Sequence, residues 1–574
     1  MATKAEMTLD LSFGTISAAR ADGPKPARFR IALMGDFSGR AAKGEVEVGS
    51  DLAKRRPIKL DVDTLEKVIK GFGTTLVLPI GKKGQGIEVE LGSVDDLHPD
   101  ELFEKVEMFA ELVALKRRLA SGATAKGAVT ELREWGREFG KKVSPPARSS
   151  AGNSVPADRK LSDFAKLVGG KGRVQAKASP ADELLSRIVG PYIQALPDPN
   201  AAAMQEAVEE SLAGAMRMVL HHPEFQSVEA QWRMLDLITR SVETDAKLDI
   251  VLYDISAEEL AADLAAQDDL TQSGFCDLLV EGTPDGRGRF SAVCGFYTFE
   301  ETPPHAELLG RIAKVCAHVN APFFGAISTG FMEVAKDDRH PLVAEAWNAL
   351  CALPEAGYVG LASPRFLLRR PYGAKTDPIY EFDFEEFTEA EGLSGMLWAN
   401  PVALVVILLA RSFRKTGPSL GLGQVMTLGG MPFHYVKDRY GDQVALPCTE
   451  RNLTQTRTQA AIARGLMPVV SVKGRDEVRL TSFQSLAGST VLGPWSDVPP
   501  PKPKEEAKRT SPQKVEASDD SSSDDSDSGS SDSTDDDLAA LLAGFDDSTP
   551  DDSGSDDSAS DDMDAELAAL LASL

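Results

Sequence analysis

The chain of 574 residues contains little cysteine and no hydrophobic run long enough to span a membrane. Its five cysteines are scattered without a CxxC pair, which predicts buried, reduced thiols and argues against a disulfide framework or a zinc site. The opening residues, MATKAEMTLDLSFG, lack the apolar stretch of a signal peptide, and the most apolar run, residues 401–410, is too short to cross a bilayer. These absences predict a cytoplasmic protein.

Basic charge is also scarce. The formal net charge is −26, and no lysine or arginine occurs from Val515 to Leu574. A nucleic-acid partner would require a basic face on the protein. A strong negative field also opposes binding to anionic membranes. We therefore expect neither nucleic acid nor membrane as a partner.

Catalytic and metal-binding motifs are missing as well. The sequence has no HExxH, no Ser/His/Asp constellation and no paired carboxylates in a cleft-like pattern. Residues 35–39 (GDFSG) follow an expected strand but lack the Lys-Ser/Thr of a P-loop, which favours a plain turn. His221 and His222 are adjacent and precede Pro223, a pattern typical of a helix end rather than of two converging metal ligands. We expect no enzyme, no cofactor and no metal.

What the sequence does contain is an alternation of strand and helix patterns, which predicts an α/β fold. Asp63 is the expected N-cap of the first helix. Strands are expected at residues 28–34, 75–79, 87–91, 248–255, 277–280, 291–297, 323–326 and 469–472. Helices are expected at residues 63–71, 99–119, 182–189, 201–219, 228–242 and 306–319.

Two sets of motifs resemble the contractile sheath of bacterial type VI secretion. RRPIKLDVDTLEKVI and IEVELGSVDDLHPDELFEKVEMFAELVALKRRLA resemble TssB, the small sheath subunit. LHHPEFQSVEAQWRML, VNAPFFGAIS, YVGLASPRFLLRRPYG followed by EFDFEE, LWANPV and the long CTERNLTQTRTQAAIARGLMPVVSVKGRDEVRLTSFQSL resemble TssC, the large subunit, in order and at family spacing. The resemblance implies two intertwined α/β domains in one chain.

These motifs and the composition divide the chain into five parts. We expect a polar lead-in, a TssB-like domain, a flexible linker rich in Pro, Ser and Gly, a truncated TssC-like domain, and a disordered acidic Ser/Asp tail. The respective ranges are 1–26, 27–139, 140–180, 181–495 and 496–574.

The resemblance implies a structural, non-enzymatic component of a type VI apparatus in a bacterial cytoplasm. Its implied partners are other sheath, tube or baseplate proteins and a recycling ATPase of the ClpV type. After Leu486 the chain departs from the large-subunit pattern, which in the family continues with strands shared between neighbours. This departure predicts a specialised terminal, adaptor or regulatory unit. The alternative is a soluble scaffold, derived from sheath subunits, that recruits partners through its acidic tail.

Three groups of residues are candidate sites. Leu184, Leu185 and Ile188 share one side of the helix expected at 182–189, where the family implies recognition by the ATPase; an ordinary core helix is the alternative. Arg365, Arg369 and Arg370 are near acidic residues 383, 385 and 386, which favours a loop fixed by ion pairs over an anion site.

The third group consists of two near-copies of a LAALLA motif in the acidic tail. Leucines at i, i+3 and i+4 give each copy one apolar face, typical of a helix that docks into a groove on a protein partner that the sequence does not identify. The two faces are Leu538, Leu541, Leu542 and Phe545, and Leu567, Leu570, Leu571 and Leu574.

Overall fold

The structure is a computed structural model that describes residues 11–18, 28–78, 80, 86–119, 124–138, 201–280, 289–388, 391–418, 420–437, 440 and 442–496. The chain divides into two units, residues 1–501 and 502–574, and all described residues belong to the first. The expected helix at 182–189 and both LAALLA motifs lie outside the described residues. We call residues 28–138 the N-terminal half and residues 201–496 the C-terminal half.

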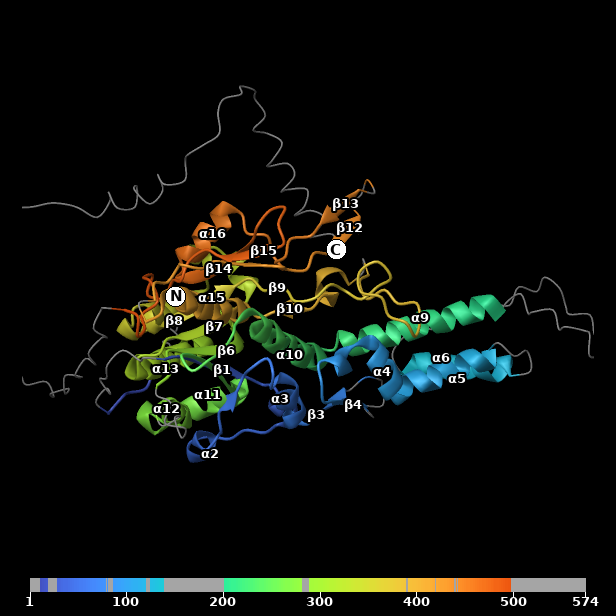
Figure 1. The fold of residues 1–574 in the computed structure, drawn as a ribbon, viewed down its shortest axis with the longest axis horizontal. Helices are drawn as coiled ribbons and strands as arrows, with labels where there is room; N and C mark the ends of the chain where they lie inside the picture. Colours follow the sequence, from blue (N-terminus) through green and yellow to red (C-terminus); the bar gives the residue numbers. More distant parts are fainter. Residues whose placement is uncertain are drawn as a thin grey trace, which may run out of the picture. The chain divides into compact units, whose positions relative to one another are not determined.

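The N-terminal half begins with a strand and ends with three consecutive helices (Figure 1). Its elements are β1 (Phe29–Gly35), α1 (Arg40–Lys43), α2 (Ser50–Ala53), β2 (Ile58–Lys59), α3 (Leu65–Phe72), β3 (Thr74–Leu78), β4 (Ile87–Leu91), α4 (Pro99–Lys105), α5 (Glu107–Leu119) and α6 (Ala125–Glu138).

The C-terminal half alternates strands and helices, as the sequence pattern predicts. Its helices are α9 (Ala201–Leu220), α10 (Pro223–Ser241), α11 (Ala257–Ala265), α12 (Gly274–Val280), α13 (Pro303–Val319), α14 (Pro341–Cys351), α15 (Val402–Thr416) and α16 (Gln455–Ile462). Its strands are β5 (Leu248–Asp254), β6 (Ala292–Phe299), β7 (Phe323–Ile327), β8 (Val359–Ser363), β9 (Phe366–Leu367), β10 (Trp398–Ala399), β11 (Thr427–Gly429), β12 (Tyr435–Lys437), β13 (Gln443–Ala445), β14 (Leu466–Ser471) and β15 (Glu477–Leu480).

A nine-stranded mixed sheet combines strands from both halves. Its order is β11-β15-β14-β8-β7-β6-β1-β5-β2, so β1 lies inside a sheet built mostly by the C-terminal half. Successive residues of β1 point to opposite faces: Ile31 and Leu33 join the core cluster that contains α10 and α15, whereas Ala32 and Met34 join the cluster that contains α11 to α14. The fold is therefore α/β, with the two halves intertwined.

The N-terminal half also contributes elements that lie outside the nine-stranded sheet. The β3–β4 hairpin forms a separate two-stranded sheet, and α5 packs against both α6 and α9, which lie beside it in Figure 1. The apolar run at 401–410 falls almost wholly within α15, whose residues 402–410 are all buried. Among the described helices, none is both long and apolar enough to cross a membrane.

Residues 277–280 do not form the predicted strand. They lie in α12, whose first turn is held by a carboxylate distant in sequence: Asp263 accepts hydrogen bonds from the N–H groups of Gly274 (3.0 Å) and Phe275 (2.8 Å). Orphan N–H groups at a helix start need such partners. Because the partner comes from α11, a local pattern did not reveal it.

Two helix boundaries in the N-terminal half also differ from the prediction. The single helix expected at 99–119 is divided into α4 and α5, because Val106 takes an extended backbone conformation (φ −91°, ψ 117°) with its side chain buried. The N-cap of α3 is Thr64 rather than Asp63.

Candidate functional site

The candidate functional site is the seam, by which we mean the contacts between the N-terminal and C-terminal halves. Strand β1 pairs in parallel with β5 over seven residues, from Phe29 opposite Leu248 to Gly35 opposite Asp254. On its other side it pairs in parallel with β6, and the edge strand β2 pairs antiparallel with β5. All seven residues of β1 are buried. The sheet of the C-terminal half is thus continuous only with this strand in place.

A charged pair crosses the seam inside the sheet. The guanidinium of Arg30 on β1 is 1% exposed; its Nε donates to the Asp249 carboxylate on β5 (3.3 Å), and its Cζ lies 4.9 Å from the centre of the Phe290 ring. Burial of an arginine requires such partners, because a charge left unpaired in the interior is strongly destabilising. The pair therefore favours this strand order.

The GDFSG turn after β1 is held by the C-terminal half. Asp254, at the end of β5, accepts hydrogen bonds from the N–H groups of Phe37 (2.8 Å) and Ser38 (3.2 Å) and from the Ser38 hydroxyl (2.7 Å). The buried Trp232 indole on α10 donates to the Phe37 carbonyl (2.9 Å). A Cβ at Gly35 would lie 2.6 Å from the Gln231 side-chain oxygen, so a larger residue there would have to displace that side chain. These groups of the turn therefore make hydrogen bonds within the chain, as expected for a plain turn.

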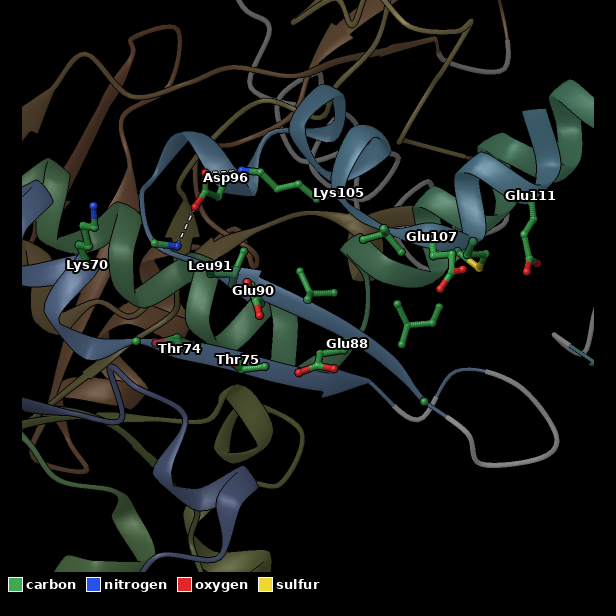
Figure 2. Close-up of a pocket in the computed structure, with 17 residues that line it drawn as sticks. Lys70, Thr74, Thr75, Glu88, Glu90, Leu91, Asp96, Lys105, Glu107 and Glu111 are labelled. Carbon is green, nitrogen blue, oxygen red and sulfur yellow. Dashed lines mark hydrogen bonds and ion pairs between the residues drawn. The ribbon is translucent and has the colours of Figure 1, made fainter. Parts of the chain in front are cut away.

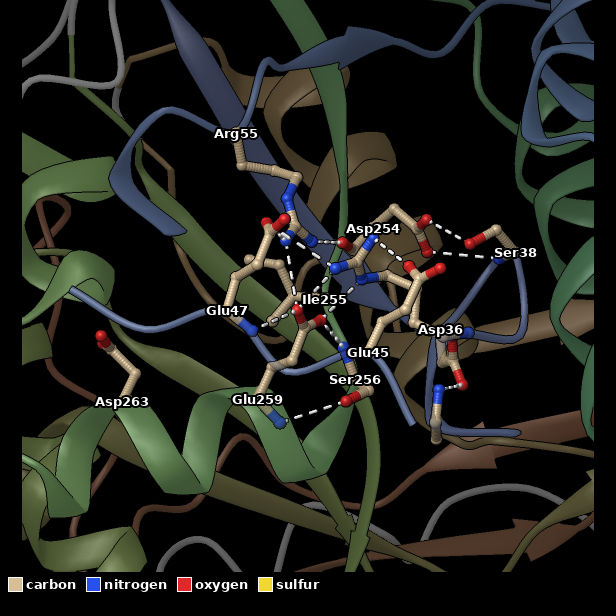
Figure 3. A network of polar contacts seen from close by, with 12 residues as sticks. Asp36, Ser38, Glu45, Glu47, Arg55, Asp254, Ile255, Ser256, Glu259 and Asp263 are labelled. Carbon is tan, nitrogen blue, oxygen red and sulfur yellow. Dashed lines mark hydrogen bonds and ion pairs between the residues drawn. The ribbon is translucent and has the colours of Figure 1, made fainter. Parts of the chain in front are cut away.

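Glu259 on α11 is the centre of a polar network that joins the two halves at the seam (Figure 3). Its carboxylate is fully buried and accepts hydrogen bonds from the Arg40 guanidinium (2.9 and 3.0 Å), the Arg55 guanidinium (3.1 Å) and the Glu47 N–H (3.1 Å). It also completes a capping box with Ser256 at the start of α11. One side chain of the C-terminal half thus holds three residues of the N-terminal half.

The electrostatics of Glu259 reflect these contacts. Burial raises its pKa, but the hydrogen bonds from Arg40 and Arg55 outweigh burial and hold the pKa at about 2. One turn further along α11, Asp263 accepts a hydrogen bond from the Gly49 N–H (2.6 Å). Three carboxylates of the C-terminal half therefore hold the loop between β1 and β2: those of Asp254, Glu259 and Asp263.

A second buried ionic cluster surrounds Arg369. Its guanidinium binds Glu229 on α10 (2.7 Å) and Glu386 (2.6 and 2.9 Å), both at most 1% exposed, and its Cζ lies 4.2 Å from the centre of the Tyr372 ring. Arg233 binds both Glu229 and the Tyr372 hydroxyl. Burial raises the pKa of Glu386, but the charge and hydrogen bonds of Arg369 and the hydrogen bond from the Tyr372 N–H outweigh burial and lower the pKa to about 2.

This Arg369 cluster positions residues that touch the N-terminal half. The Asp100 carboxylate on α4 accepts a hydrogen bond from the Tyr380 N–H (3.1 Å), and the rings of Phe103 and Phe382 lie 5.2 Å apart. The His98 ring meets the Tyr372 ring edge-on at 5.1 Å. The cluster is therefore a second support of the seam.

The structure does not bring the three candidate arginines together. Arg365 pairs with Glu450 (2.6 Å) and is half exposed, whereas Arg370 is exposed and its carbonyl accepts a hydrogen bond from Arg369. Of the two histidines, His222 caps α10 and His221 lies 3.6 Å from Glu386.

A broad hollow of about 1040 Å³ lies between the β3–β4 hairpin and the start of α5 (Figure 2). Carboxylates and lysines share its lining, but Lys105 is already bound to Asp96 (2.7 Å) and Glu101 (3.1 Å). Over the described part of the chain, no three or more His, Cys, Asp or Glu side chains are grouped to hold a metal ion. The polar groups of the seam serve packing and hydrogen bonding.

Comparison with known proteins gives matches for both halves. Residues 24–135 match the family model described as type VI secretion system, VipA, and residues 202–487 match the VipB tail sheath N-terminal domain. The type VI secretion system sheath protein TssC1 of Pseudomonas aeruginosa is 33% identical over 300 residues, which cover 49% of this chain and 60% of that relative. The chain thus spans less than two thirds of the relative's length.

These matches define a class of protein, the contractile-sheath proteins of type VI secretion. Within that class the chain is a fusion: a TssB-like small-subunit domain is followed by a TssC-like large-subunit domain in one polypeptide, which confirms the prediction from the motifs.

The low pKa values of Glu259 and Glu386 predict an acid-sensitive seam. Both are about 2, below the ordinary glutamate value of about 4.3, so the unfolded chain takes up protons first as the pH falls. The stability they contribute is full above about pH 4.3 and is lost toward pH 2. We expect the urea midpoint to fall over this range, and to fall less steeply in Glu259→Gln. Parallel pH profiles for the two proteins would contradict this assignment.

Proposed function

We propose that the protein is a non-enzymatic structural component of a type VI-like contractile apparatus in the bacterial cytoplasm, supplied as a preassembled unit of small and large sheath domains. The observation that carries this proposal is β1, a buried strand of the TssB-like half inside the sheet of the TssC-like half. Such an interface resembles a domain core cut in half, which is typical of obligate complexes.

The fusion has a direct physical consequence. Linking two partners replaces a bimolecular encounter with an intramolecular one, at an effective concentration set by the linker. The two domains are also made in equal numbers. A fused protein of this kind suits a place in the apparatus that takes one small and one large sheath domain together, because separate subunits need not first find each other.

We further propose a specialised terminal, adaptor or regulatory place in the apparatus. The match to the N-terminal sheath domain ends at residue 487, and the sequence that follows is rich in proline and then in Asp and Ser. The two LAALLA motifs in this acidic stretch are proposed docking elements for a partner protein, and residues 182–189 a proposed site for the recycling ATPase. Other sheath, tube or baseplate proteins are the remaining proposed partners.

Electron microscopy tests this proposal. Purified protein should form short rings or stacks, and, when mixed with separate small and large sheath subunits, should be found at the ends of their tubes. Long tubes formed by this protein alone would rule out the specialised role. Failure to associate with sheath subunits under conditions in which those subunits assemble would favour the soluble scaffold instead.

A further inference from the structure

The hollow of about 1040 Å³ beside the β3–β4 hairpin, which we call the β4 hollow, is lined only by residues of the N-terminal half (Figure 2). One wall is the edge of β4: every residue from Gly86 to Gly92 lines the hollow, whereas only the first two residues of β3 do. The other wall is the junction of α4 and α5, residues 105–108 together with residue 111. The hollow therefore follows one strand along its whole length.

Strand β4 presents a free edge to this hollow. Its one neighbour is β3, in an antiparallel two-stranded sheet. In such a pair, alternate residues direct their N–H and C=O groups toward the partner strand, and the residues between them direct theirs away from it. Within the described part of the chain, no group outside the hairpin bonds to the backbone of Ile87–Leu91. An unpaired strand edge of this kind is a template for another extended chain.

One end of this edge is closed by Asp96. Its carboxylate accepts hydrogen bonds from the N–H groups of Gly92 (2.6 Å) and Ser93 (3.0 Å) and pairs with Lys105 (2.7 Å). The open part of the edge is then β4 itself, which at about 3.4 Å per residue gives about 17 Å of strand. That length matches a short extended peptide segment.

The lining of the β4 hollow is acidic. Five carboxylates line it against two lysines, and one of these, Lys105, is already bound to Asp96. Figure 2 shows the other, Lys70, at the far end of the hollow from α5. The remaining four carboxylates are exposed and form no ion pair within the described part of the chain: Glu88, Glu90, Glu107 and Glu111.

We propose that the β4 hollow is a docking site for a partner protein, which adds an extended basic segment to the edge of β4. Glu88 and Glu90 lie on the same face of β4, because side chains alternate along a strand and Val89 between them is buried. Lysine or arginine at every second position of the added strand would therefore lie opposite them. Main-chain pairing supplies affinity in this mode of recognition, and alternate side chains supply specificity.

A small molecule fits these observations less well than a peptide. Small-molecule pockets typically have volumes of roughly 300–1,000 Å³ and are lined mainly by apolar side chains, whereas the β4 hollow is large, follows a strand edge and is rich in carboxylates. The inference is independent of the proposed place in the apparatus.

Peptide binding to the full chain tests strand addition. The probe is the fluorescently labelled peptide VKVKVKV, in which lysine occupies every second position, and the readout is its fluorescence anisotropy. We expect it to bind about tenfold more tightly than the same peptide with N-methylated backbone amides, which keeps the charge but cannot donate to a strand edge. Equal binding of the two peptides, or no binding of VKVKVKV, would overturn the proposal.

Charge reversal places the peptide on β4. Glu88→Lys combined with Glu90→Lys should weaken binding of VKVKVKV about tenfold, because two attractive cross-strand pairs become repulsive. Glu66→Lys combined with Glu104→Lys is the matched control: both residues are exposed, belong to the same half and lie outside the hollow, and the change in net charge is the same. Equal weakening in both double variants would overturn the proposal. So would sedimentation showing that the unliganded chain self-associates through Glu88 and Glu90, because the occupant would then be a second copy.

Discussion

Replacing Glu259 with glutamine is expected to destabilise the folded unit by about 3–5 kcal/mol, the range for removing one partner of a buried ionic pair. The carboxylate is fully buried and binds both Arg40 and Arg55, so the amide leaves the two guanidinium groups to the half-exposed carboxylates of Glu45 and Glu47. The measurement is the urea midpoint at pH 7. The loop between β1 and β2 should also lose protection in hydrogen exchange before the rest of the sheet.

Glu258 is the matched control, because it is the adjacent residue on α11 and is exposed. Glu258→Gln should change the free energy of unfolding by less than about 0.5 kcal/mol, as is usual for surface substitutions. Equal effects of the two substitutions would show that the network around Glu259 does not stabilise the seam.

The sequence predicted the class of fold and the fusion of two sheath domains, because hydrophobic periodicity and dense family motifs are local signals. The buried strands around residues 29–35 and 248–254 lie where their patterns place them, whereas helix α15 was not predicted from its apolar run. The order of strands in the sheet cannot be read from such local signals. Nothing in the pattern of β1 alone indicates that its neighbours are β5 and β6, more than 200 residues away in the chain.

The seam network was missed for the same physical reason. The Ser256-x-x-Glu259 spacing is a capping-box signal, and it could have placed Glu259 at a helix start. It could not reveal that the same carboxylate accepts hydrogen bonds from Arg40 and Arg55, because those partners come from another domain. The arginine-rich loop was recognised as a candidate ionic site, but Glu229, the partner of Arg369 on α10, is 140 positions away.

Replacing Arg369 with methionine is expected to have a comparably large effect, about 3–5 kcal/mol of lost stability. The substitution leaves Glu386 buried without its guanidinium partner, and Glu229 with Arg233 alone. Arg369→Lys should recover only part of the loss, because a single ammonium cannot reproduce the paired contacts to both carboxylates. The pKa of Glu386 should rise, since burial would no longer be outweighed, and the acid sensitivity of the variant should change accordingly.

Arg365 in the same loop supplies the control for this prediction. It is half exposed and pairs with Glu450 at the surface, where ion pairs contribute about 0–1 kcal/mol. Arg365→Met should therefore lower the urea midpoint only slightly, while Arg369→Met should lower it strongly and also weaken protection of the Tyr380 amide, which donates to Asp100 across the seam. If Arg365→Met proves as damaging as Arg369→Met, the loop as a whole supports the seam, and burial of one ionic cluster does not explain its stability.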